Sequence, residues 1–409
     1  MKKVLNKNVA VIFVCWLVYT CSYIGKLGYN ANITQIETAF GISHAESGSV
    51  GTAFFFAYGA GQVINGIFCK KYHPAYVIFI ALLVSAGCNF VVPFLTDFAW
   101  LKYIWLLNGA ALSFLWSLLA RFLSENLDES YVPKAVVAMG TTVACGTFAV
   151  YGLSALFVKM SAYKLIFFVA SVILPIVAVV WLIGCLSFGK REKQTEELPL
   201  NKGLPPEGKP GGKPIDRSVI TVMVLLGVFA VAVNLVKDGI TVWIPTMLKE
   251  IYVMPDHLSI LLTLCLPLVA IFGTAVAVFL NRYIKNFVSL CGVFFCAVVL
   301  AIGGDLLFGG ISAAVLIVCL CIVSLVASGA NNVITSMAPL SYKSGNAGLL
   351  AGVMNGCSYI GSAVSSYGLG VIADSFGWNG VFVFLISVSA LCAVVSLCYS
   401  LFHRLFCGK

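Results

Sequence analysis

Apolar residues gather along the chain into long runs that are separated by short polar segments. A helix needs about 20 apolar residues to cross the hydrocarbon core of a membrane, and each run is long enough for one such helix. Cap and turn signals divide the runs, among them the capping box Ser43-His-Ala-Glu46 and prolines near expected helix starts (Pro74, Pro133 and Pro255). The pattern predicts twelve spans: 8–33, 45–69, 74–94, 99–122, 134–158, 163–187, 218–247, 257–280, 286–306, 311–337, 345–372 and 378–402.

The composition places these spans in a membrane rather than in a soluble core. Of the 409 residues, 60% are apolar and only 10% are charged, whereas a soluble domain is about a quarter charged. The predicted fold class is therefore all-α and integral to the lipid bilayer. The net charge of +9 comes from short loops between the spans rather than from one soluble face, so nucleic acid is not expected as a partner.

One long polar tract interrupts the series of spans. Residues 188–217 are rich in Pro, Gly, Lys and Glu, a composition that cannot bury an apolar core and is typical of a linker. Six predicted spans precede it and six follow. The sequence therefore predicts an N-terminal six-helix bundle (1–187), a cytoplasmic linker (188–217) and a C-terminal six-helix bundle (218–409).

The distribution of lysine and arginine predicts the orientation in the membrane. Nineteen of the 25 fall on the side that holds both termini and the linker, four fall in loops on the other side, and two lie inside spans. Cytoplasmic loops carry such an excess of positive charge. We expect a multi-pass protein of the cytoplasmic (inner) membrane with both termini in the cytoplasm. The first apolar run is too long for a signal peptide and contains a lysine, so it is expected to remain as the first span.

The two halves of the chain resemble each other weakly. A shift of 211 residues places Lys26 on Lys237, and a separate shift of 215 residues places Gly146 on Gly361. These matches fall at equivalent spans and in the same inside-to-outside sense, which favours a parallel repeat of six helices. The predicted fold is thus two pseudo-symmetric bundles, with the two lysines at similar depth on the first and seventh spans.

Lys26 is a charged residue where hydrocarbon is expected. It lies near the outer end of the first span and shares one helix face with Tyr19, Tyr23 and Asn30. A charge at membrane depth costs several kcal/mol and is by default a sign of a functional site. The alternative is a lysine whose stem extends to the membrane interface. The tyrosine and asparagine neighbours favour a lined cavity.

Lys237 is the second lysine inside a span, with Asn234 and Thr241 on its helix face. Asp238 is its neighbour in sequence and is expected to point about 100° away, so that the two side chains do not face each other. Three roles remain open for Asp238: a counter-charge for Lys26 in an empty cavity, a proton carrier, or a member of a structural salt bridge. Two intramembrane cations, one from each half, suggest a site for an anion.

Other residues add less to this picture. Tyr58 and Gln62 lie one turn apart on the second span, and the glycine-rich stretches 140–152 and 352–370 indicate close helix packing. The fifteen cysteines are scattered, without a CxxC pair, and are expected to be apolar packing residues. No paired carboxylates, no Ser-His-Asp set and no phosphate-binding loop occur. The sequence therefore predicts neither an enzyme nor a metal site, and no cofactor.

Several segments resemble the major facilitator superfamily, and within it the organophosphate:phosphate antiporters of the glycerol-phosphate and hexose-phosphate type. The resemblance extends over nearly the whole chain apart from the linker. The segments that carry it are YIGKLGYN at 23–30, AYGAGQ at 57–62, KDGITVWIPTMLKE at 237–250, SYIG at 358–361 and DSFGWNG at 374–380.

The resemblance implies roles for particular residues. In that family two arginines, on the first and seventh helices, hold the phosphate, and their places are taken here by Lys26 and Lys237. Lysine keeps the charge but cannot form the bidentate fork of arginine. Further family positions on this chain, four tyrosines and one tryptophan, are Tyr19, Tyr23, Tyr58, Tyr359 and Trp116.

The sequence also departs from the family pattern in ways that bear on the substrate. A pocket lysine is replaced by Gln62, a histidine by Ala144, and tyrosines by Asn234 and Ser328. Fewer cations make a monoanion or a carboxylate as plausible a substrate as a phosphate ester.

The sequence as a whole predicts a monomeric secondary transporter that moves a small organic anion by alternating access, with anion exchange as its mode. The alternatives are a proton-coupled symporter and a transporter-like membrane sensor of a phosphorylated metabolite. The expected substrate-binding residues are Lys26, Lys237, Tyr19, Tyr23, Asn30, Tyr58, Gln62, Trp116, Asn234 and Tyr359, with Asp238 as the proton or charge partner.

Overall fold

The computed structural model describes residues 2–68, 71–188, 217–308, 312–341 and 347–406. Within these ranges the regular structure is helical, and no strand occurs. Almost all of the predicted linker, residues 189–216, lies outside the described residues, so the interpretation of this tract stays a prediction.

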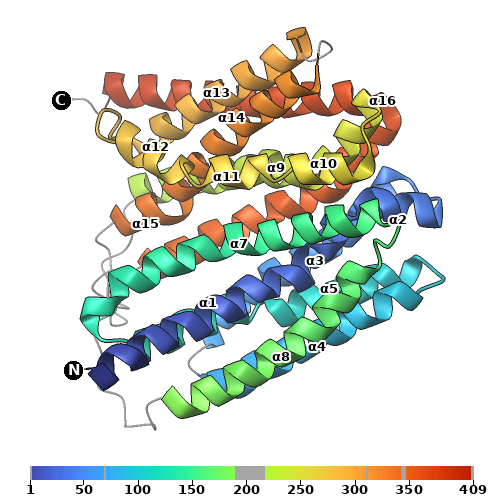
Figure 1. The fold of residues 1–409 in the computed structure, drawn as a ribbon. Helices are drawn as coiled ribbons and strands as arrows, with labels where there is room; N and C mark the ends of the chain where they lie inside the picture. Colours follow the sequence, from blue (N-terminus) through green and yellow to red (C-terminus); the bar gives the residue numbers. More distant parts are fainter. Residues whose placement is uncertain (1, 69–70, 189–216, 309–311, 342–346, 407–409) are drawn as a thin grey trace. The chain divides into compact units, whose positions relative to one another are not determined.

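The first six predicted spans are confirmed as helices (Figure 1). The long apolar runs form helices because every backbone N–H and C=O must find a partner within the segment when lipid surrounds it. The fourth span is interrupted at Ser113 and Phe114 and therefore consists of two helices. The elements are α1 (Lys2–Ala31), α3 (His44–Phe68), α4 (Pro74–Val91) with a 3-10 turn (Val92–Phe94), α5 (Ala99–Leu112), α6 (Leu115–Asn126), α7 (Val132–Lys159) and α8 (Leu165–Phe188).

The second half repeats this series with two modifications. The eighth predicted span is divided into three short helices, and the tenth ends in a π-helical turn. The elements are α9 (Arg217–Tyr252), α10 (Asp256–Leu262), α11 (Cys265–Ala270), α12 (Gly273–Leu280), α13 (Phe287–Phe308), α14 (Ala313–Asn332), the π turn (Val333–Met337), α15 (Ala338–Ser341) and α16 (Ala347–Phe406).

Helix α16 contains both of the last two predicted spans. It turns back on itself (Figure 1), because Gly377 has a φ of 66° and a ψ of −177° and so interrupts the helical path. Residues with a Cβ rarely adopt this backbone conformation, whereas glycine adopts it without a steric penalty. In the described part of the chain ten helices are long and apolar enough to cross a membrane, and one of them is this double span, Leu350–Phe402. With α3 as a further helix of 25 residues, the twelve predicted spans are confirmed.

One helix was missed by the sequence analysis. Helix α2 (Ile33–Phe40) follows α1 directly, in a segment expected to be a loop. It is amphipathic, and Ile33 and Ile36 on its apolar face are buried. The amide of Asn32 stands at the junction, where it donates to Gly28 O of α1 at 2.8 Å and to Ser154 Oγ of α7 at 3.0 Å.

The described residues group by their contacts into two units. Unit 1 comprises residues 2–35 and 53–188, and unit 2 comprises 36–52 and 217–406. Most of α2 and the first turns of α3 therefore belong by their contacts to unit 2. The predicted domain boundaries at 187 and 218 border the undescribed tract and stay predictions.

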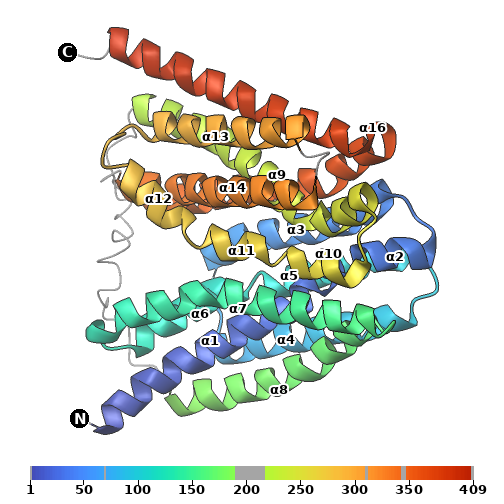
Figure 2. The same ribbon diagram turned by 45° about the horizontal axis from the view of Figure 1, so that its top comes forward.

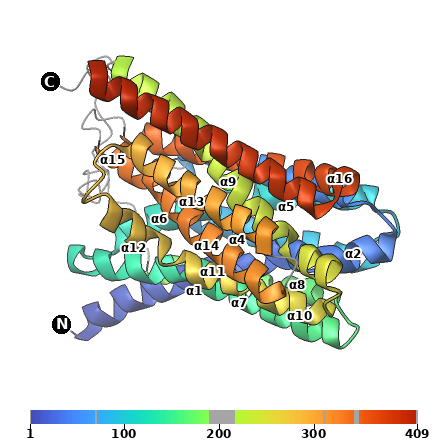
Figure 3. The ribbon, with the colours of Figure 1, turned by 90° about the horizontal axis from the view of Figure 1, so that it is seen from above.

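In unit 1, α1 packs against α7 and α8, and α4 packs against α5 and α8 (Figure 2). Large aromatic side chains fill the interior, among them Trp105, Tyr151, Phe167 and Trp181, each at most 1% exposed. The indole of Trp181 donates to Pro74 O at 3.2 Å and to Ala75 O at 3.1 Å, which satisfies the one polar atom of this side chain. In unit 2, α9 packs against α16, and α13 packs against α14 and α16 (Figure 3).

Two glycines show that the halves share one helix-crossing geometry. A Cβ on Gly146 of α7 would lie 2.7 Å from Thr20 O of α1, and a Cβ on Gly361 of α16 would collide with Val231 O of α9. Thr20 and Val231 are themselves 211 residues apart, the same shift that relates the two lysines. The fifth span of each half thus meets the first span of that half backbone to backbone, as a parallel repeat requires.

The predicted close packing of the two glycine-rich stretches is confirmed only in part. It holds at Gly146 and Gly361, and also at Gly370, where an added Cβ would lie 2.5 Å from His44 O. Gly140, Gly152 and Gly352 face open space, with nothing within 4 Å of an added Cβ. A glycine meets a neighbouring backbone only where it lies on the helix face that packs against another helix, so the number of glycines in a stretch does not by itself predict close packing.

Candidate functional site

Lys26 in unit 1 lies in an aromatic cage. Its Nζ is 4.4 Å from the ring centre of Tyr58, 5.4 Å from that of Tyr23 and 5.8 Å from that of Phe54. Tyr23 precedes Lys26 by one turn on α1, and Phe54 and Tyr58 are one turn apart on α3, so both helices present their rings to the ammonium group. The faces of aromatic rings attract a cation by about 0.5–2 kcal/mol each. The contacts favour a lined pocket over a lysine that extends to the membrane interface.

The cage leaves the charge of Lys26 uncompensated. Among the described residues of unit 1, no carboxylate lies within 4.0 Å of its Nζ, and its side chain is only partly buried. Ring faces stabilise the ammonium group but do not neutralise it, because their attraction comes from a quadrupole rather than from a net charge. An anionic ligand would supply the missing opposite charge.

The aromatic residues predicted from the sequence come together around this lysine. Tyr19 meets Tyr23 edge to face, with ring centres 5.6 Å apart, and meets Trp116 of α6 at 5.1 Å. Trp116 is 41% exposed, so the aromatic row extends from the buried cage to an open surface of unit 1. Arg121 does not join this row, because its guanidinium contacts Glu125 at 2.6 Å and Tyr72 O at 2.9 Å.

Two further predicted residues of unit 1, Gln62 and Asn30, form no described hydrogen bond with Lys26. The amide of Gln62 donates to Ser113 O at 3.2 Å, where it satisfies a carbonyl at the break between α5 and α6. Asn30 is 7% exposed near the end of α1. No hydrogen bond or ion pair joins either side chain to Lys26 in the described structure, and their part in binding stays a prediction.

A group of buried amides that the sequence analysis missed supports the backbone next to Lys26. Asn108 and Asn89 both donate to Gly25 O, at 2.9 and 3.2 Å, and Ser85 Oγ donates to Asn108 Oδ1 at 2.7 Å. All three side chains are fully buried. Buried amides that are hydrogen-bonded fix the geometry around them, so this group holds the Gly25–Lys26 segment of α1 in place. The presence of asparagines inside apolar spans is the feature of the sequence that could have predicted this group.

Lys237 in unit 2 has a different environment. Its Nζ is 3.3 Å from Asp238 Oδ1, so the prediction that the two side chains do not face each other is wrong. Adjacent Cα–Cβ bonds do diverge, but the four-carbon stem of lysine is long and flexible enough to bring its ammonium group back to a neighbouring carboxylate. The second oxygen of Asp238 accepts a hydrogen bond from Ser362 of α16. Both charged side chains are 24% exposed.

A cluster of hydrogen-bonded amide and hydroxyl side chains lies one helical turn before the Lys237–Asp238 pair. Asn234 donates to Asn331 Oδ1 of α14 at 2.9 Å, and Ser358 of α16 donates to the same oxygen at 3.3 Å. Thr241 donates to Lys237 O at 2.8 Å, so its hydroxyl serves the helix backbone. Asn234 was predicted from the sequence to lie here, whereas Asn331, which precedes the π turn of the tenth span, was not.

Tyr359 follows Ser358 on α16 and is partly buried. Consecutive positions on a helix point about 100° apart, so the direction of Ser358 does not set that of Tyr359. The role of Tyr359 in binding stays a prediction.

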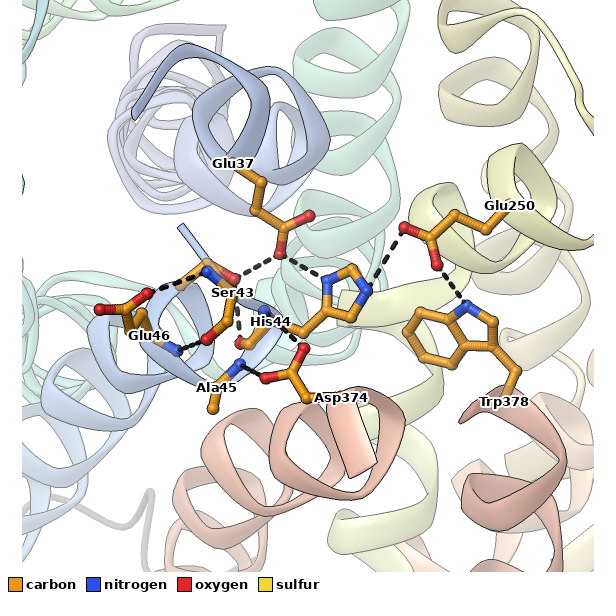
Figure 4. A network of polar contacts seen from close by, with 9 residues as sticks. Glu37, Ser43, His44, Ala45, Glu46, Glu250, Asp374 and Trp378 are labelled. Carbon is orange, nitrogen blue, oxygen red and sulfur yellow. Dashed lines mark hydrogen bonds and ion pairs between the residues drawn. The ribbon is translucent and has the colours of Figure 1, made fainter. Parts of the chain in front are cut away.

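Unit 2 contains a second polar network, around His44 (Figure 4). His44 Nδ1 is 3.0 Å from Glu37 Oε1 of α2, and Nε2 is 3.3 Å from Glu250 Oε1 of α9. The indole of Trp378 donates to the other oxygen of Glu250 at 2.8 Å. From the sequence, His44 was expected only as a member of the capping box.

His44 also stands at a doubly capped helix start (Figure 4). Asp374 of α16 accepts hydrogen bonds from the backbone N–H groups of His44 and Ala45, at 3.0 and 2.8 Å. A carboxylate at this position satisfies free N–H groups and complements the helix dipole. The predicted capping box is confirmed as well, because Ser43 N donates to Glu46 and Glu46 N donates to Ser43 Oγ, at 2.9 and 3.2 Å.

The carboxylates around His44 favour its protonated form. The residue stands at the first position of α3, ahead of the predicted span 45–69. Burial of the ring lowers its pKa, but hydrogen bonds and charge interactions with Glu250 and Glu37 outweigh burial and raise the pKa from 6.5 to about 10. The protonated imidazole therefore forms two ion pairs, one with Glu37 of α2 and one with Glu250 of α9.

The described residues contain no cluster of three or more His, Cys, Asp or Glu side chains able to hold a metal ion. The described cysteines are free and do not form disulfides with one another.

Comparison with known proteins gives consistent results. The family model of the Major Facilitator Superfamily matches residues 15–366. A "probable hexose phosphate transport protein" of Chlamydia pneumoniae is 20% identical over 97% of this chain and 92% of its own length.

Solved structures of transporters share the fold. A bacterial homologue of the human lysosomal transporter Spinster, in an inward-facing and occupied conformation, has a TM-score of 0.75 at 13% identity, covering 97% of each chain. A POT-family transporter has a TM-score of 0.71 at 12% identity, covering 97% of this chain and 98% of its own. A nucleoside transporter has a TM-score of 0.69 at 14% identity, covering 96% and 99%.

These results, together with the twelve spans and the repeated helix crossing, confirm the resemblance found in the sequence and identify a membrane transporter rather than an enzyme. The chain belongs to the Major Facilitator Superfamily.

Proposed function

We propose that this protein is a secondary carrier that moves a small organic anion across the cytoplasmic membrane by alternating access, in exchange for another anion. The observation that carries the proposal is Lys26, a cation on a membrane-spanning helix. It is surrounded by three ring faces and has no carboxylate partner among the described residues of unit 1. Such a charge is costly to keep in a membrane and persists where it has a function.

Electrostatics gives the size of the effect. A unit anion about 4 Å from an ammonium group is attracted by about 4 kcal/mol at the effective dielectric constant of a partly buried site. The rings of Tyr23 and Tyr58 limit the water that competes for Lys26, which supports binding at this position. In the proposal Lys237 contributes the second cation, and Tyr19, Trp116, Asn234, Asn30, Gln62 and Tyr359 contact the rest of the ligand.

Two classes of anion fit this description. The relative from Chlamydia pneumoniae is named for hexose phosphate, which supports a phosphate ester. Two lysines in place of the arginine fork support a carboxylate equally well, because an ammonium group binds either as a point charge.

Exchange follows from the cost of moving an uncompensated charge. A carrier that changes conformation with Lys26 unpaired must carry that charge through a low-dielectric environment, whereas a loaded carrier presents a neutralised site. A ligand shifts a conformational equilibrium by its difference in affinity for the two states. Loaded carriers are therefore expected to change state faster than empty ones, which makes exchange faster than net transport.

Proton-coupled symport is the second candidate, and Asp238 is the observation that favours it. In this alternative the proton carrier is Asp238, a carboxylate on a membrane-spanning helix that is hydrogen-bonded by Ser362 and paired with Lys237. A membrane sensor that binds the same metabolite is a third interpretation, and only transport measurements separate it from a carrier. A monomer belongs to the proposal. So does the placement of both termini in the cytoplasm, which the lysine and arginine distribution supports.

The test is counterflow uptake in proteoliposomes that contain the purified protein. Vesicles preloaded with inorganic phosphate, a hexose phosphate, a hexonate (a sugar acid) or a dicarboxylate are assayed for uptake of the same labelled compound. We expect uptake of at least one anion that depends on the internal anion, together with loss of that uptake in Lys26→Ala. An imposed pH gradient separates exchange from proton coupling, because only a coupled carrier accumulates the anion in response to it.

Two results would overturn the proposal. One is a wild-type protein that binds these anions and exchanges none of them, which would indicate a sensor. The other is normal anion transport by both Lys26→Ala and Lys237→Ala, because the lysines would then have no part in binding.

A further inference from the structure

We propose that a groove between the first halves of α1 and α7 is a second binding site for the transported anion, in which Lys134 attracts the charge and Phe13 and Trp16 pack against an apolar ring of the ligand. The inference rests on the proposed function, because its ligand is the anion that Lys26 is proposed to bind. It goes further by adding a second site on the same helix and by naming the ligand class, an anion that carries a ring with an apolar face.

The α1–α7 groove lies within unit 1, between two helices that pack side by side (Figure 1). Its volume is about 730 Å³. Helix α1 contributes Phe13 and Trp16 to the lining, α7 contributes Lys134 and Thr141, and the 3-10 turn Glu129–Tyr131 contributes Tyr131. Sites for small molecules are typically concave and mostly apolar, with a few polar groups that orient the ligand. The groove has this character.

The aromatic wall of the groove is held in a fixed arrangement. The rings of Phe13 and Trp16 are stacked, with centres 6.4 Å apart and planes 19° from parallel. The indole of Trp16 donates a hydrogen bond to Thr141 Oγ1 at 2.9 Å, which ties the ring to α7. Phe13 is 57% exposed, so a ring face is accessible to a ligand. An aromatic face of this kind packs against the apolar face of a sugar or aromatic ring.

Lys134 gives the groove a positive charge that no described carboxylate compensates. Its Nζ is 4.6 Å from the ring centre of Tyr131, and no ion pair joins it to a carboxylate among the described residues. The nearest acids in sequence are Asp128, which accepts a hydrogen bond from Asn8 at 2.7 Å, and the exposed Glu129. A ring face stabilises a cation without neutralising it. The groove therefore repeats the combination found at Lys26, a cation on an aromatic ring without a described counter-charge.

Helix geometry connects the groove to the cage of Lys26. At about 100° per residue, Trp16, Tyr23 and Lys26 lie within about 80° of one another around α1, and Trp16 precedes Lys26 by about 15 Å along the axis. Helix α7 follows α1 over this distance, since a Cβ on Gly146 would lie 2.6 Å from Tyr23 Cβ. A ligand that leaves Lys134 thus meets Lys26 farther along the same face of α1.

An anionic phospholipid is the rival occupant. Lysine and aromatic side chains near a membrane surface commonly contact lipid headgroups. The face of α1 decides between the two, because Trp16 shares its face with Tyr23 and Lys26 instead of presenting a separate one. We therefore assign the groove to the transported anion, and the lipid is one outcome of the test.

The first experiment measures binding in the absence of the Lys26 site. A hexose phosphate is titrated into purified Lys26→Ala, and the emission of Trp16 is obtained as the difference between Lys26→Ala and Lys26→Ala/Trp16→Phe. We expect a saturable change in this emission that is lost in Lys26→Ala/Lys134→Ala and retained in Lys26→Ala/Lys134→Arg. A parallel titration uses dispersed phosphatidylglycerol in place of the hexose phosphate.

The second experiment measures the effect of the groove on transport. In Lys134→Ala we expect the half-saturation concentration for hexose phosphate counterflow to rise about tenfold at low ionic strength, because a cation at a site raises the local concentration of an anion. The rise should shrink in about 1 M salt, where charges are screened beyond about 3 Å. A purely structural role of Lys134 would not depend on salt. Lys7→Ala removes a cation from the same end of α1 but outside the groove, and should leave the value unchanged.

A third measurement tests the proposed class of ligand. Trp16→Leu should raise the half-saturation concentration for a hexose phosphate and for glucuronate, which both carry a ring, by about fivefold. It should not change the value for inorganic phosphate, which has no apolar part. Thr141→Val is the matched control, because it removes the hydrogen bond of Trp16 and keeps the ring.

Three results would overturn the inference. One is the absence of a Trp16 response to hexose phosphate in Lys26→Ala, and a response to phosphatidylglycerol alone would assign the groove to lipid. The second is an equal response with and without Lys134. The third is an effect of Lys134→Ala on transport that does not vary with salt. Binding at Trp16 is measured without transport, so these results are distinct from failure of the proposed function, in which the wild type exchanges no anion.

Discussion

The lysines of α1 and α9 occupy equivalent positions in a repeat of 211 residues, yet their surroundings differ. Lys26 lies against the rings of Tyr23, Phe54 and Tyr58, with no carboxylate partner described in its unit. Lys237 forms an ion pair with Asp238, and among the described residues no aromatic ring faces it. The repeat has kept the position and the charge of the residue, whereas the partners have diverged. A shared position therefore does not imply a shared task.

The same contrast extends to other charges of unit 2. His44 is paired with Glu37 and Glu250, and Lys249 of α9 is 3.0 Å from Asp256 of α10. Paired charges within a unit contribute to its structure, and removing one partner leaves the other uncompensated. An unpaired charge such as Lys26 does little for stability and is available to a ligand. Variants of Lys26, His44, Glu37 and Tyr58 test this distinction.

Lys26→Ala is expected to have the largest effect, on transport. Loss of the attraction between one cation and the anion corresponds to about 4 kcal/mol, or about a thousandfold in the ratio of maximal rate to half-saturation concentration. Thermal unfolding in detergent should change little or shift upward, because the cage holds no ion pair to be broken. Lys26→Arg keeps the charge and is the matched control. A large fall in melting temperature in Lys26→Ala would contradict this interpretation and assign Lys26 a structural role.

His44→Gln should show the opposite behaviour, a loss of stability. Removing the imidazolium leaves Glu37, which is 8% exposed, without its charged partner, and breaking a buried ion pair costs about 3 kcal/mol or more. Because folding raises the pKa of His44 from 6.5 to about 10, the stabilisation is complete below pH 6.5 and is lost as pH rises toward 10. The melting temperature of the wild type minus that of the variant should therefore shrink between pH 6.5 and 10.

Glu37→Gln is the companion of this variant. It retains a hydrogen-bonding side chain for His44 while removing one of the two charges that hold its proton. The difference in melting temperature between Glu37→Gln and the double variant Glu37→Gln/His44→Gln should then disappear at a lower pH than the difference between the wild type and His44→Gln. A difference that stays constant with pH in both variants would show that the pairs around His44 are not ionic.

The glycines of the repeated helix crossing compare the two halves in packing. Gly361→Ala places a methyl group against Val231 O, and Gly146→Ala places one 2.7 Å from Thr20 O. Overpacking of this kind costs about 1–3 kcal/mol, with the larger value expected at Gly361, where the backbones are closer. Gly352→Ala and Gly140→Ala lie on the same two helices with open space around them and serve as controls. Equal melting temperatures for all four variants would contradict the described crossing.

Tyr58→Leu should have the smallest effect. It removes the ring nearest to Lys26, at 4.4 Å, and a cation–π contact of about 1 kcal/mol corresponds to about a fivefold rise in half-saturation concentration. Tyr58→Phe keeps the ring face and should change the value less. If the two variants behave alike, the hydroxyl rather than the ring face is the group that matters, and the cage interpretation fails.

Much of the architecture could be predicted from the sequence, because membrane spans depend on properties that are local along the chain. The length of an apolar run determines whether it can cross the bilayer, and the capping box at Ser43 uses groups only three residues apart. The prediction of helices from the sequence was wrong or incomplete where a helix was short or amphipathic. Helix α2 contains a buried glutamate, Glu37, and does not look like a span, and the eighth span is broken into three pieces without a proline signal at each break.

The candidate site was predicted less completely, for a physical reason. That Tyr23 precedes Lys26 by one turn follows from helix geometry, whereas the approach of Tyr58 from α3 depends on how α1 and α3 pack. The supporting amides of Asn89 and Asn108 converge on Gly25 O from different helices, and no spacing in the sequence relates them. The separation of Lys237 from Asp238 was inferred from the directions of their Cα–Cβ bonds, which do not limit the end of a long side chain.

The sequence by itself determined the spans, the six-plus-six repeat and the presence of one lysine on the first helix of each half, since these depend on hydrophobicity and position along one chain. The tertiary structure decided which lysine is compensated and which is not. Charge compensation depends on side chains brought within about 4 Å by helix packing, and the sequence fixes their order along the chain but not these distances. Lys26 was therefore recognisable as unusual from the sequence, and only the structure distinguished it from Lys237.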